Sequence, residues 1–407
     1  MFHTRIYKRY SSFNILTRSY SRGVKDYLRK NPELLEIKQY IPDKYLKTSS
    51  KIANEYLYLI CPNAAHKIAD HVVSAATDNQ IIAETNTGLG LITTELLEKG
   101  IKKVRMYESC SEFRVDLKNF ATVYPGRVEL FIKNLFHLSR FTYMDKQDGM
   151  NRVSSLLKGV PRKAWTDDPA ITVIGTMPNL RFLRYLMASL ALQSGPVLYG
   201  RMQLYAIMKK THYQTLTATP KQNLRLYRHT TVLFQLLFDY ETLETFPRNI
   251  FLPWEKVTQK PNLQDEETVL IKINFKKNLG IPTGQILSLF HFVKQFFRTG
   301  NNIVIPTMEK WVPDCGLNIL MPKLEHDFDY FSDINIFTKF RELEPPQILA
   351  LFREMINTPT YAGSPFTAMV ENELIKTETT ETGITEAVLQ KALTKDAETL
   401  NYQDDFD

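Results

Sequence analysis

Short apolar segments alternate with amphipathic stretches along the chain as far as residue 280. The apolar segments have the length and composition of strands, and they cover residues 80–84, 104–108, 128–132, 171–174, 198–208, 240–246 and 269–274. The stretches between them place apolar residues at helical spacing, over residues 62–73, 91–98, 112–120, 181–192 and 225–238. Strands that alternate with helices form a mostly parallel sheet covered on both faces. The pattern therefore predicts an α/β fold, with 269–274 as its final edge strand.

Three regions depart from this alternation. Residues 23–55 are polar and predict a loosely packed lead-in. Residues 139–169 are charged and poor in apolar periodicity, which predicts a surface insertion. After Pro282 the pattern becomes helical, with amphipathic stretches over 283–298 and 345–357. The expected domains are an α/β domain over residues 23–280 and a separate helical domain over residues 281–370.

Composition excludes several classes of protein. Hydrophobic residues make up 43% of the 407 residues and charged residues 23%, both ordinary values for a globular chain. No apolar stretch approaches the roughly 20 residues that a membrane helix needs, so we expect no membrane partner. The cysteines Cys61, Cys110 and Cys315 are isolated, and the histidines lack metal-ligand spacing. We therefore expect neither a disulfide framework nor a metal site.

Charge is distributed unevenly along the chain. Residues 1–22 combine bases, serines and tyrosines with no acid, and they lack the apolar core of a secretory signal. This composition predicts a mitochondrial presequence. Residues 371–407 are acidic and rich in threonine, which predicts a disordered tail. The body between them is basic, which suits a nucleic-acid partner and equally suits an ordinary solvated surface.

The segment between the first strand and its helix has the strongest chemical signal. Residues 84–93 read ETNTGLGLIT, so Gly88 and Gly90 lie in a turn where the backbone can approach a ligand beside free helix N–H groups. The next strand ends in Glu108, where an acid holds the ribose hydroxyls of nucleoside cofactors. A third glycine and a P-loop lysine are missing, which disfavours NAD and ATP. A tight turn that only packs a helix on a sheet remains the alternative.

These residues resemble a known family. The pattern E-x-x-x-G-x-G-x-x-T is similar to the S-adenosylmethionine motif of the ribosomal RNA adenine dimethyltransferases, and YLYLICPN at residues 56–63 resembles their QNFLxDPN segment. Gly200-Arg201-Met202 and Leu226-Tyr227 resemble the mitochondrial transcription factor B branch, also called dimethyladenosine transferase 2. The resemblance covers residues 50–330. It implies a Rossmann-like class I SAM-dependent methyltransferase sheet with a C-terminal helical domain. The cofactor contacts that it implies are Leu57, Glu84, Asn86, Gly88, Gly90, Glu108 and Asn134.

The family's catalytic tetrapeptide is degenerate in this chain. The resemblance implies Asn-Leu-Pro-Tyr after the fourth strand, where the amide and a main-chain carbonyl hold the target amine and the ring stacks on the extruded adenine. The matching residues here are Thr176, Met177, Pro178 and Asn179. Leu57 and Asn134 stand where the family has an asparagine and an acid. We therefore expect no catalytic residue at this tetrapeptide, weak or vestigial S-adenosylmethionine binding, and little or no methyl transfer.

Basic residues lie among tyrosines in the second half of the chain, a combination that suits single-stranded nucleic acid. The candidate contacts are Arg181, Arg184, Arg201, Lys209, Lys210, Arg225, Arg228, Lys294 and Arg298. Each of them is also explained as a surface or snorkelling side chain. The family resemblance implies a basic cluster near Arg298 that this chain does not match, and a cation that favours a helix C-terminus is the alternative there.

The resemblance implies a transcription initiation factor of the mitochondrial matrix nucleoid. Such a protein binds the mitochondrial RNA polymerase and melted promoter DNA, and we expect a monomer. Mitochondrial transcription factor A and 12S rRNA are further partners that the resemblance suggests. Two alternatives remain open, an active S-adenosylmethionine-dependent 12S rRNA adenine N6-dimethyltransferase and a general RNA-binding protein of the mitochondrial ribosome.

Overall fold

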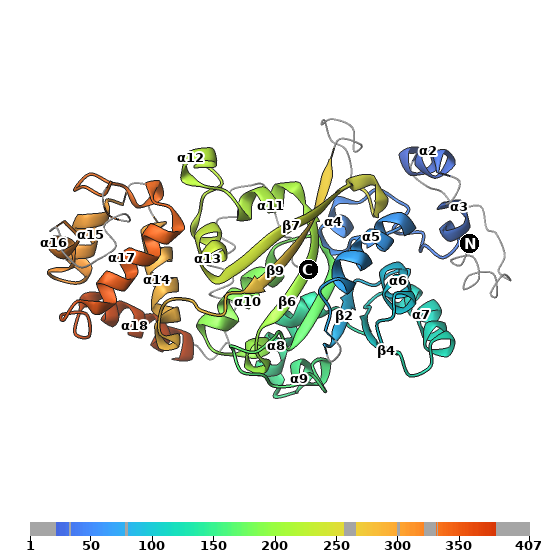
Figure 1. Ribbon diagram of the computed structural model, residues 1–407, viewed down its shortest axis with the longest axis horizontal. Helices are drawn as coiled ribbons and strands as arrows, with labels where there is room; N and C mark the ends of the chain where they lie inside the picture. Colours follow the sequence, from blue (N-terminus) through green and yellow to red (C-terminus); the bar gives the residue numbers. More distant parts are fainter. Residues whose placement is uncertain are drawn as a thin grey trace.

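A computed structural model of the chain describes residues 22–379, except 32–33, 78–79, 256–265, 299–301, 321–330 and 332. A seven-stranded sheet of order β4-β3-β2-β5-β6-β9-β7 runs through its centre (Figure 1). The strands are β2 (Ile82–Thr85), β3 (Val104–Tyr107), β4 (Val128–Phe131), β5 (Ile171–Met177), β6 (Met202–Lys209), β7 (Phe238–Pro247) and β9 (Glu267–Phe275). Pairing is parallel from β4 through β6, and β9 is antiparallel to both of its neighbours. The predicted class I methyltransferase sheet is confirmed.

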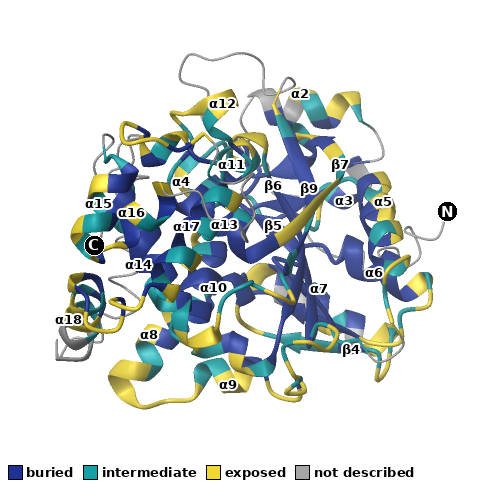
Figure 2. Cartoon of the chain, turned by 60° about the vertical axis from the view of Figure 1, so that its left-hand side comes forward, coloured by how far each residue is buried: buried dark blue, intermediate teal, exposed yellow. Residues whose placement is uncertain are grey.

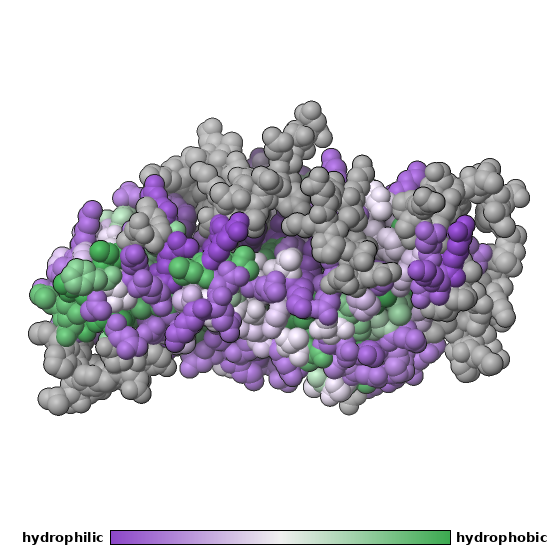
Figure 3. Space-filling model, turned by 90° about the horizontal axis from the view of Figure 1, so that it is seen from above, coloured by the Kyte–Doolittle hydropathy of each residue, from purple (hydrophilic) through white to green (hydrophobic). Residues whose placement is uncertain are grey.

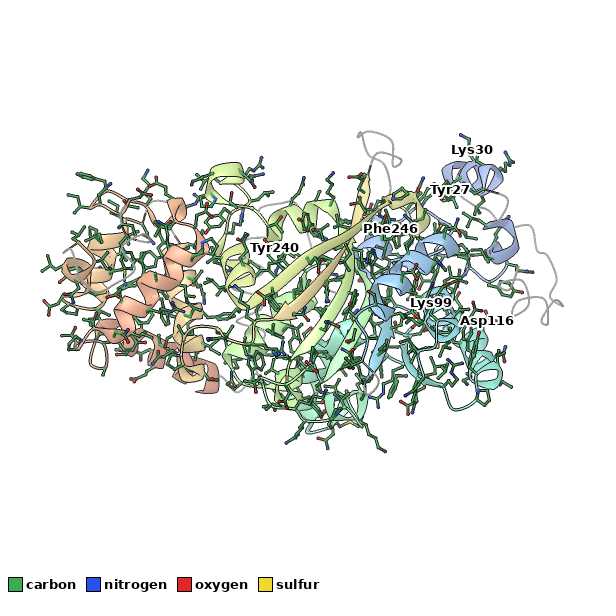
Figure 4. All side chains as sticks on the ribbon, viewed as in Figure 1. Tyr27, Lys30, Lys99, Asp116, Tyr240 and Phe246 are labelled. Carbon is green, nitrogen blue, oxygen red and sulfur yellow. The ribbon has the colours of Figure 1, made fainter. Side chains whose placement is uncertain are left out.

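The prediction of 269–274 as an edge strand is wrong. β9 pairs with β6 on one side and with β7 on the other, and Ile273 has the partners Leu204 and Tyr240. The edge strand is β7, whose course Tyr240 and Phe246 mark in Figure 4. Most residues of β7 are exposed or half-buried, whereas the apolar residues of β9 are buried on both faces. A strand with both faces covered and both edges paired has to be apolar, which is why β9 rather than β7 is internal.

Helices cover both faces of the sheet (Figures 1 and 2). One face is covered by α5 (Pro62–Val73), α6 (Leu91–Glu98) and α7 (Ser111–Val123). The other is covered by α8 (Leu138–Asp148), α10 (Arg181–Ala191) and α13 (His229–Leu237). Consecutive strand residues point to opposite faces, so Val173 contributes to one hydrophobic core and Ile174 to the other. Shorter elements complete this part: α9 (Arg152–Leu156), α11 (Lys210–Leu216), α12 (Pro220–Asn223) and the antiparallel pair β1 (Tyr58–Leu59) and β8 (Phe251–Leu252).

Two regions expected to pack loosely are part of the cores. The lead-in forms α2 (Arg22–Lys30), α3 (Leu35–Lys38) and α4 (Ser50–Glu55), and it buries apolar side chains, among them Leu28 and Leu46. The expected insertion forms α8 and α9, and it buries Phe141 and Leu157. Both predictions are wrong because a few apolar residues on one side of a short helix suffice to anchor it, even when the average composition is polar.

The C-terminal helices are present as predicted. They are α14 (Ile286–Phe296), α15 (Val304–Trp311), α16 (Cys315–Leu320), α17 (Pro345–Asn357) and α18 (Pro365–Thr379). Phe296 stacks on Phe340 with ring centroids 3.8 Å apart, and the Tyr227 hydroxyl donates to the carbonyl of Leu343 at 2.7 Å. These helices share one hydrophobic core with α10 and α13, so the helical part is joined to the α/β part rather than separate from it.

Apolar side chains are exposed at one end of the molecule. Exposed apolar residues, including Leu317 and Phe337, belong to the end formed by the C-terminal helices, where apolar surface gathers in Figure 3. Among the described helices, none has the length and apolar character required to cross a bilayer. Residues 371–379 continue α18 and do not begin a disordered tail. The predicted presequence and residues 380–407 lie outside the described residues, apart from Arg22 at the start of α2.

Candidate functional site

The carboxyl ends of the parallel strands meet at one edge of the sheet. The strand order reverses there between β2 and β5, and open α/β sheets bind ligands at such a reversal. We refer to this place as the carboxyl edge. The structure brings together at this edge the residues that the sequence singled out after consecutive strands, namely Asn86, Gly88 and Gly90 after β2, Glu108 after β3, Asn134 after β4 and Thr176 near the end of β5.

The turn between β2 and α6 is built from left-handed residues. Asn86, Gly88 and Gly90 have φ angles of 56°, 55° and 71°, in a region that favours glycine and tolerates asparagine. Glu84 secures this turn from the strand side, because one of its side-chain oxygens accepts a hydrogen bond from the Thr93 N–H at 2.9 Å and a second from the Thr93 hydroxyl. Burial raises the pKa of Glu84 to about 8. Glu84 therefore holds the turn against the start of α6.

Glu108 is completely buried beneath this turn. Its carboxylate accepts hydrogen bonds from the Gly88 N–H at 2.8 Å, the Cys110 N–H at 2.7 Å and the Tyr58 hydroxyl at 3.2 Å. Burial raises the pKa of Glu108. Burial and then the charge of Glu108 raise the pKa of Tyr58, so the phenol keeps its proton and acts as the donor. The acid expected to meet a ribose is thus engaged within the protein.

A chain of amides links the ends of β4, β2 and β5. The Asn134 side chain accepts from the Thr85 hydroxyl at 3.0 Å and donates to the side-chain oxygen of Asn86 at 2.7 Å. Asn86 in turn donates to the carbonyl of Thr176 at 3.0 Å. Asn134 also accepts from the Phe136 N–H at 2.8 Å. These bonds give the turn a defined shape and use the polar atoms of Asn134 and Asn86 internally.

The degenerate tetrapeptide is also bonded within the chain. The Thr176 hydroxyl donates to the carbonyl of Leu57. Asn179 donates to the carbonyl of Asn54 at 2.8 Å, and its side-chain oxygen accepts the N–H of Arg181, two residues further on, at 3.0 Å, as in an Asx turn. Met177 is buried in the core, and Pro178 is buried between these residues. Asn179 therefore serves the chain itself and has no ring to offer to a base.

One segment of the chain supplies partners to Glu108, Thr176 and Asn179. We call residues 54–58 the strap. Asn54 accepts from Asn179 and also from the Lys209 ammonium, at 3.2 Å; Leu57 accepts from Thr176; and Tyr58 donates to Glu108. The strap is continuous with β1, whose pairing with β8 holds it in place. It therefore lies across the ends of β3, β5 and β6.

Several predicted cations gather near the strap. Arg181 begins α10 and is exposed. Burial lowers the pKa of His212 to about 3, with a further contribution from the charges of Lys209 and Arg184. Burial likewise lowers the pKa of His137 to about 4, with contributions from Arg140 and Arg181. Both histidines are therefore neutral at physiological pH, and the arginines supply the positive charge at the carboxyl edge, since Lys209 is paired with Glu255 at 2.5 Å.

The remaining predicted cations lie elsewhere. Arg201 precedes β6 at the opposite edge of the sheet, where it is buried and donates to the carbonyls of Trp165 at 2.7 Å and Phe275 at 3.2 Å, and to that of Asp167. The Arg201 guanidinium is thus used to hold these backbone carbonyls together, so it is not available to nucleic acid. Lys210 pairs with Glu267, and Lys294 pairs with Glu373 at 2.9 Å. Arg225 and Arg228 lie between α12 and α13, and Arg298 follows α14.

Sequence reasoning missed Asn54, His137, Arg140 and the role of Tyr58. For Tyr58 a signal was present, because the family's QNFL segment has phenylalanine where this chain has tyrosine. The others are single polar residues outside any motif, and only the chain path brings them to the carboxyl edge. Among the described residues, His, Cys, Asp and Glu form no group arranged to hold a metal ion.

Comparison with known proteins identifies the family. The model described as ribosomal RNA adenine dimethylase matches residues 50–314. This chain belongs to the ribosomal RNA adenine dimethylase family. It is 31% identical to the mitochondrial dimethyladenosine transferase 2 of Drosophila melanogaster, over 83% of this chain and 84% of that protein. It is 24% identical to the Mus musculus protein of the same name, over 69% of this chain and 76% of that one.

Two solved structures are similar to this chain at low sequence identity. The 23S rRNA methyltransferase ErmE has 15% identity and a TM-score of 0.48, over 73% of this chain and 98% of that one. A dimethyladenosine transferase from Plasmodium falciparum has 14% identity and a TM-score of 0.47, over 74% of this chain and 97% of that one. The resemblance found in the sequence, including its mitochondrial branch, is confirmed by the family model and the curated relatives.

The site of this dimethylase-family chain can be compared with its cofactor, S-adenosylmethionine. The residue types fit, since a glycine turn, an acid after β3 and an amide after β4 are all in place. The arrangement does not fit, because Glu108 is fully buried and Asn134 nearly so, and both are bonded to protein donors. In the described conformation the acid does not face a ligand.

Proposed function

We propose that this chain is a mitochondrial transcription initiation factor, which assists the mitochondrial RNA polymerase in melting promoter DNA. In this proposal it uses a ribosomal RNA adenine dimethyltransferase scaffold whose methyl-transfer function is weak or lost. The observation that carries the proposal is the strap, because its carbonyls already accept the hydrogen bonds that Thr176 and Asn179 donate at the former target pocket, while cations remain beside it.

The bonds of the strap support the loss of methyl transfer. An extruded adenine needs acceptors for its amine and a ring to stack on. Here the Thr176 hydroxyl is turned to donate to the carbonyl of Leu57, and the side-chain oxygen of Asn179 already accepts from the Arg181 N–H at 3.0 Å. The missing ring alone costs about tenfold to a hundredfold, since base stacking is worth ~1–3 kcal/mol. Weak or vestigial binding of S-adenosylmethionine belongs to the same proposal.

The cations at the carboxyl edge support the binding of a nucleic-acid strand. Arg140 and Arg181 lie near His137, and Arg184 lies near His212 together with Lys209, which is also paired with Glu255 at 2.5 Å. Phosphate contacts from such side chains supply sequence-independent affinity, as the binding of melted DNA requires. The proposed partners are the polymerase and promoter DNA, with mitochondrial transcription factor A and 12S rRNA as secondary candidates. We propose a monomer that acts in the nucleoid of the matrix.

Run-off transcription is the direct test of this function. A linear template with a mitochondrial promoter is transcribed by the polymerase, with and without this protein. We expect specific transcript only when the protein is present, and a pre-melted promoter bubble should reduce that dependence. Transcript of equal yield without the protein would refute the proposal.

A methyl-transfer assay decides between the proposal and its enzymatic alternative. The glycine turn and the acid after β3 are specific features that favour an active 12S rRNA adenine dimethyltransferase. We expect negligible incorporation of tritiated methyl groups into a small-subunit ribosomal RNA hairpin. Sustained turnover would establish the alternative. A third outcome is binding of ribosomal RNA without turnover, together with promoter transcription that does not depend on this protein. That outcome would instead indicate an RNA-binding protein of the mitochondrial ribosome.

Removing Arg181 should weaken binding to single-stranded DNA. The side chain is exposed at the start of α10, beside the strap. If it contacts one phosphate, the salt dependence of log K should become shallower by about 0.7, the value for one contact on a single strand. Titration of Arg181→Ala with a fluorescent oligonucleotide at several salt concentrations measures this slope. The control is Lys118→Ala, which removes an exposed charge from α7. Equal slopes for the two variants would exclude Arg181 from the interface.

A further inference from the structure

The strap meets the cofactor side of the carboxyl edge through one hydroxyl group. Tyr58 lies in β1, is buried, and donates to Glu108 at 3.2 Å. Its ring lies directly on the glycine turn, since a Cβ at Gly88 would be 2.7 Å from the ring atom Cδ1. Tyr45 and Phe113 contact the same ring, each with a centroid 4.8 Å away. The hydroxyl is therefore held in one position by packing on several sides.

The carboxylate of Glu108 has few acceptor positions left. A carboxylate offers about four lone-pair sites. One oxygen accepts from Cys110 and Tyr58, and the other accepts from Gly88. The two backbone donors belong to the turns that shape the site, so they stay in place when a ligand binds. A ribose diol brings two donors of its own, and it meets the Tyr58 hydroxyl as a competitor for the same carboxylate.

Tyr58 differs from the corresponding residue of the family in its hydroxyl group and not in its aromatic ring. The resemblance of residues 56–63 to the QNFL segment implies phenylalanine at the position of Tyr58, so a ring against the glycine turn is compatible with cofactor binding. The difference is a single hydroxyl oxygen. That oxygen is where a ribose hydroxyl would donate to the acid, because both groups are O–H donors to the same carboxylate.

We propose that Tyr58 sets the cofactor affinity of this chain, because its hydroxyl replaces a ribose hydroxyl as a hydrogen-bond donor to Glu108. Tyr58 is thus a specificity-determining residue that disfavours adenosine-containing methyl donors. The proposal explains how a site with the residue types of a dimethylase holds its cofactor weakly. It goes beyond the role in transcription and does not depend on the polymerase.

The test replaces Tyr58 with phenylalanine, the family residue, in the full chain. Isothermal titration with S-adenosylhomocysteine should show binding about tenfold tighter than the wild type, the order expected for one hydrogen bond to a charged acceptor. Binding that appears where the wild type shows none supports the proposal in the same way. The matched control is Tyr56→Phe, which removes the same atom from a ring stacked on Tyr58 at 6.2 Å and should leave the affinity unchanged.

A second ligand isolates the role of the ribose. The 2′,3′-dideoxyribose analogue of S-adenosylhomocysteine lacks the hydroxyls that would donate to Glu108, so Tyr58→Phe should gain little affinity for it. An unchanged or weaker affinity of Tyr58→Phe for S-adenosylhomocysteine would overturn the proposal, and so would an equal gain for both ligands. Cooperative thermal unfolding of the ligand-free variants verifies that they are folded. Run-off transcription with the same proteins reports separately on the proposed function.

Discussion

Alanine at position 175 is expected to lower the free energy of unfolding by at least about 3 kcal/mol. A Cβ at Gly175 would lie 2.5 Å from the carbonyl oxygen of Thr85 and 2.8 Å from its Cγ2. That carbonyl belongs to β2, which pairs with β5 in the register Thr85↔Gly175. The oxygen cannot retreat without separating the two central strands of the sheet. The strain would also displace Thr176, the next residue, from its contact with the strap.

Urea unfolding of Gly175→Ala and the wild type measures this difference. Gly284→Ala is the matched control, because nothing lies within 4 Å of its added Cβ and its backbone angle is not left-handed. We expect the control to change stability by less than about 0.5 kcal/mol, as surface substitutions do. If Gly175→Ala were as stable as Gly284→Ala, the close approach of β2 and β5 described here would be incorrect.

The second large effect is a dependence of stability on pH that Glu84→Gln should remove. Burial raises the pKa of Glu84 from 4.5 to about 8. A raised pKa means that the folded chain holds the proton more tightly than the unfolded chain. This contribution is complete below pH 4.5 and is lost as the pH rises toward 8. Between pH 6.5 and 8 the wild type should therefore lose about 1.6 kcal/mol, because the slope of about 1.4 kcal/mol per pH unit halves as the pH reaches the folded pKa.

The window above pH 6.5 separates Glu84 from the histidines. Burial lowers the pKa of His137 to about 4 and of His212 to about 3, so their effect has the opposite sign and is complete above the unfolded histidine pKa of about 6.5. Burial raises the pKa of Glu108 as well, so its contribution has the same sign as that of Glu84 and is present in both proteins. Urea unfolding at several pH values measures both slopes.

Glu244→Gln is the matched control for the pH experiment. The pKa of Glu244 is lowered, first by its hydrogen bond with Lys67, so this group is ionised in both states across the window. Replacing Glu244 should shift the free energy of unfolding by the same amount at every pH in the window, without changing its slope against pH. A Glu84→Gln variant as steep as the wild type would show that Glu84 does not hold a proton in the folded chain.

Local patterns were sufficient where an element depends on its own residues. The helices at Leu91–Glu98 and Pro345–Asn357 have the predicted bounds, because capping, proline and apolar spacing are all encoded within a few residues. The left-handed turn at Gly88 and Gly90 was also predictable, since few other residues adopt that backbone. The α/β class followed from the alternation of such elements.

Predictions from average composition were wrong where a few buried residues anchor a segment that is polar overall. The lead-in and the 139–169 region are polar overall, yet Leu28, Leu46, Phe141 and Leu157 are buried. The position of β9 could not be read from the chain either. Strand β7 precedes β9 in the sequence, yet β9 lies between β6 and β7 in the sheet, because strand order depends on which strand edges pair. Each of these results depends on contacts between distant segments.

The chain's own pattern of residues was enough to establish its fold class, its glycine turn, its acid after β3 and its damaged tetrapeptide. These are properties of residue type and short-range spacing. Folding alone settled which groups satisfy one another: Tyr58 with Glu108 across 50 residues, and Thr176 with Leu57 across 119. A buried polar group must find a partner, and that partner is chosen by three-dimensional proximity, which a one-dimensional pattern does not contain.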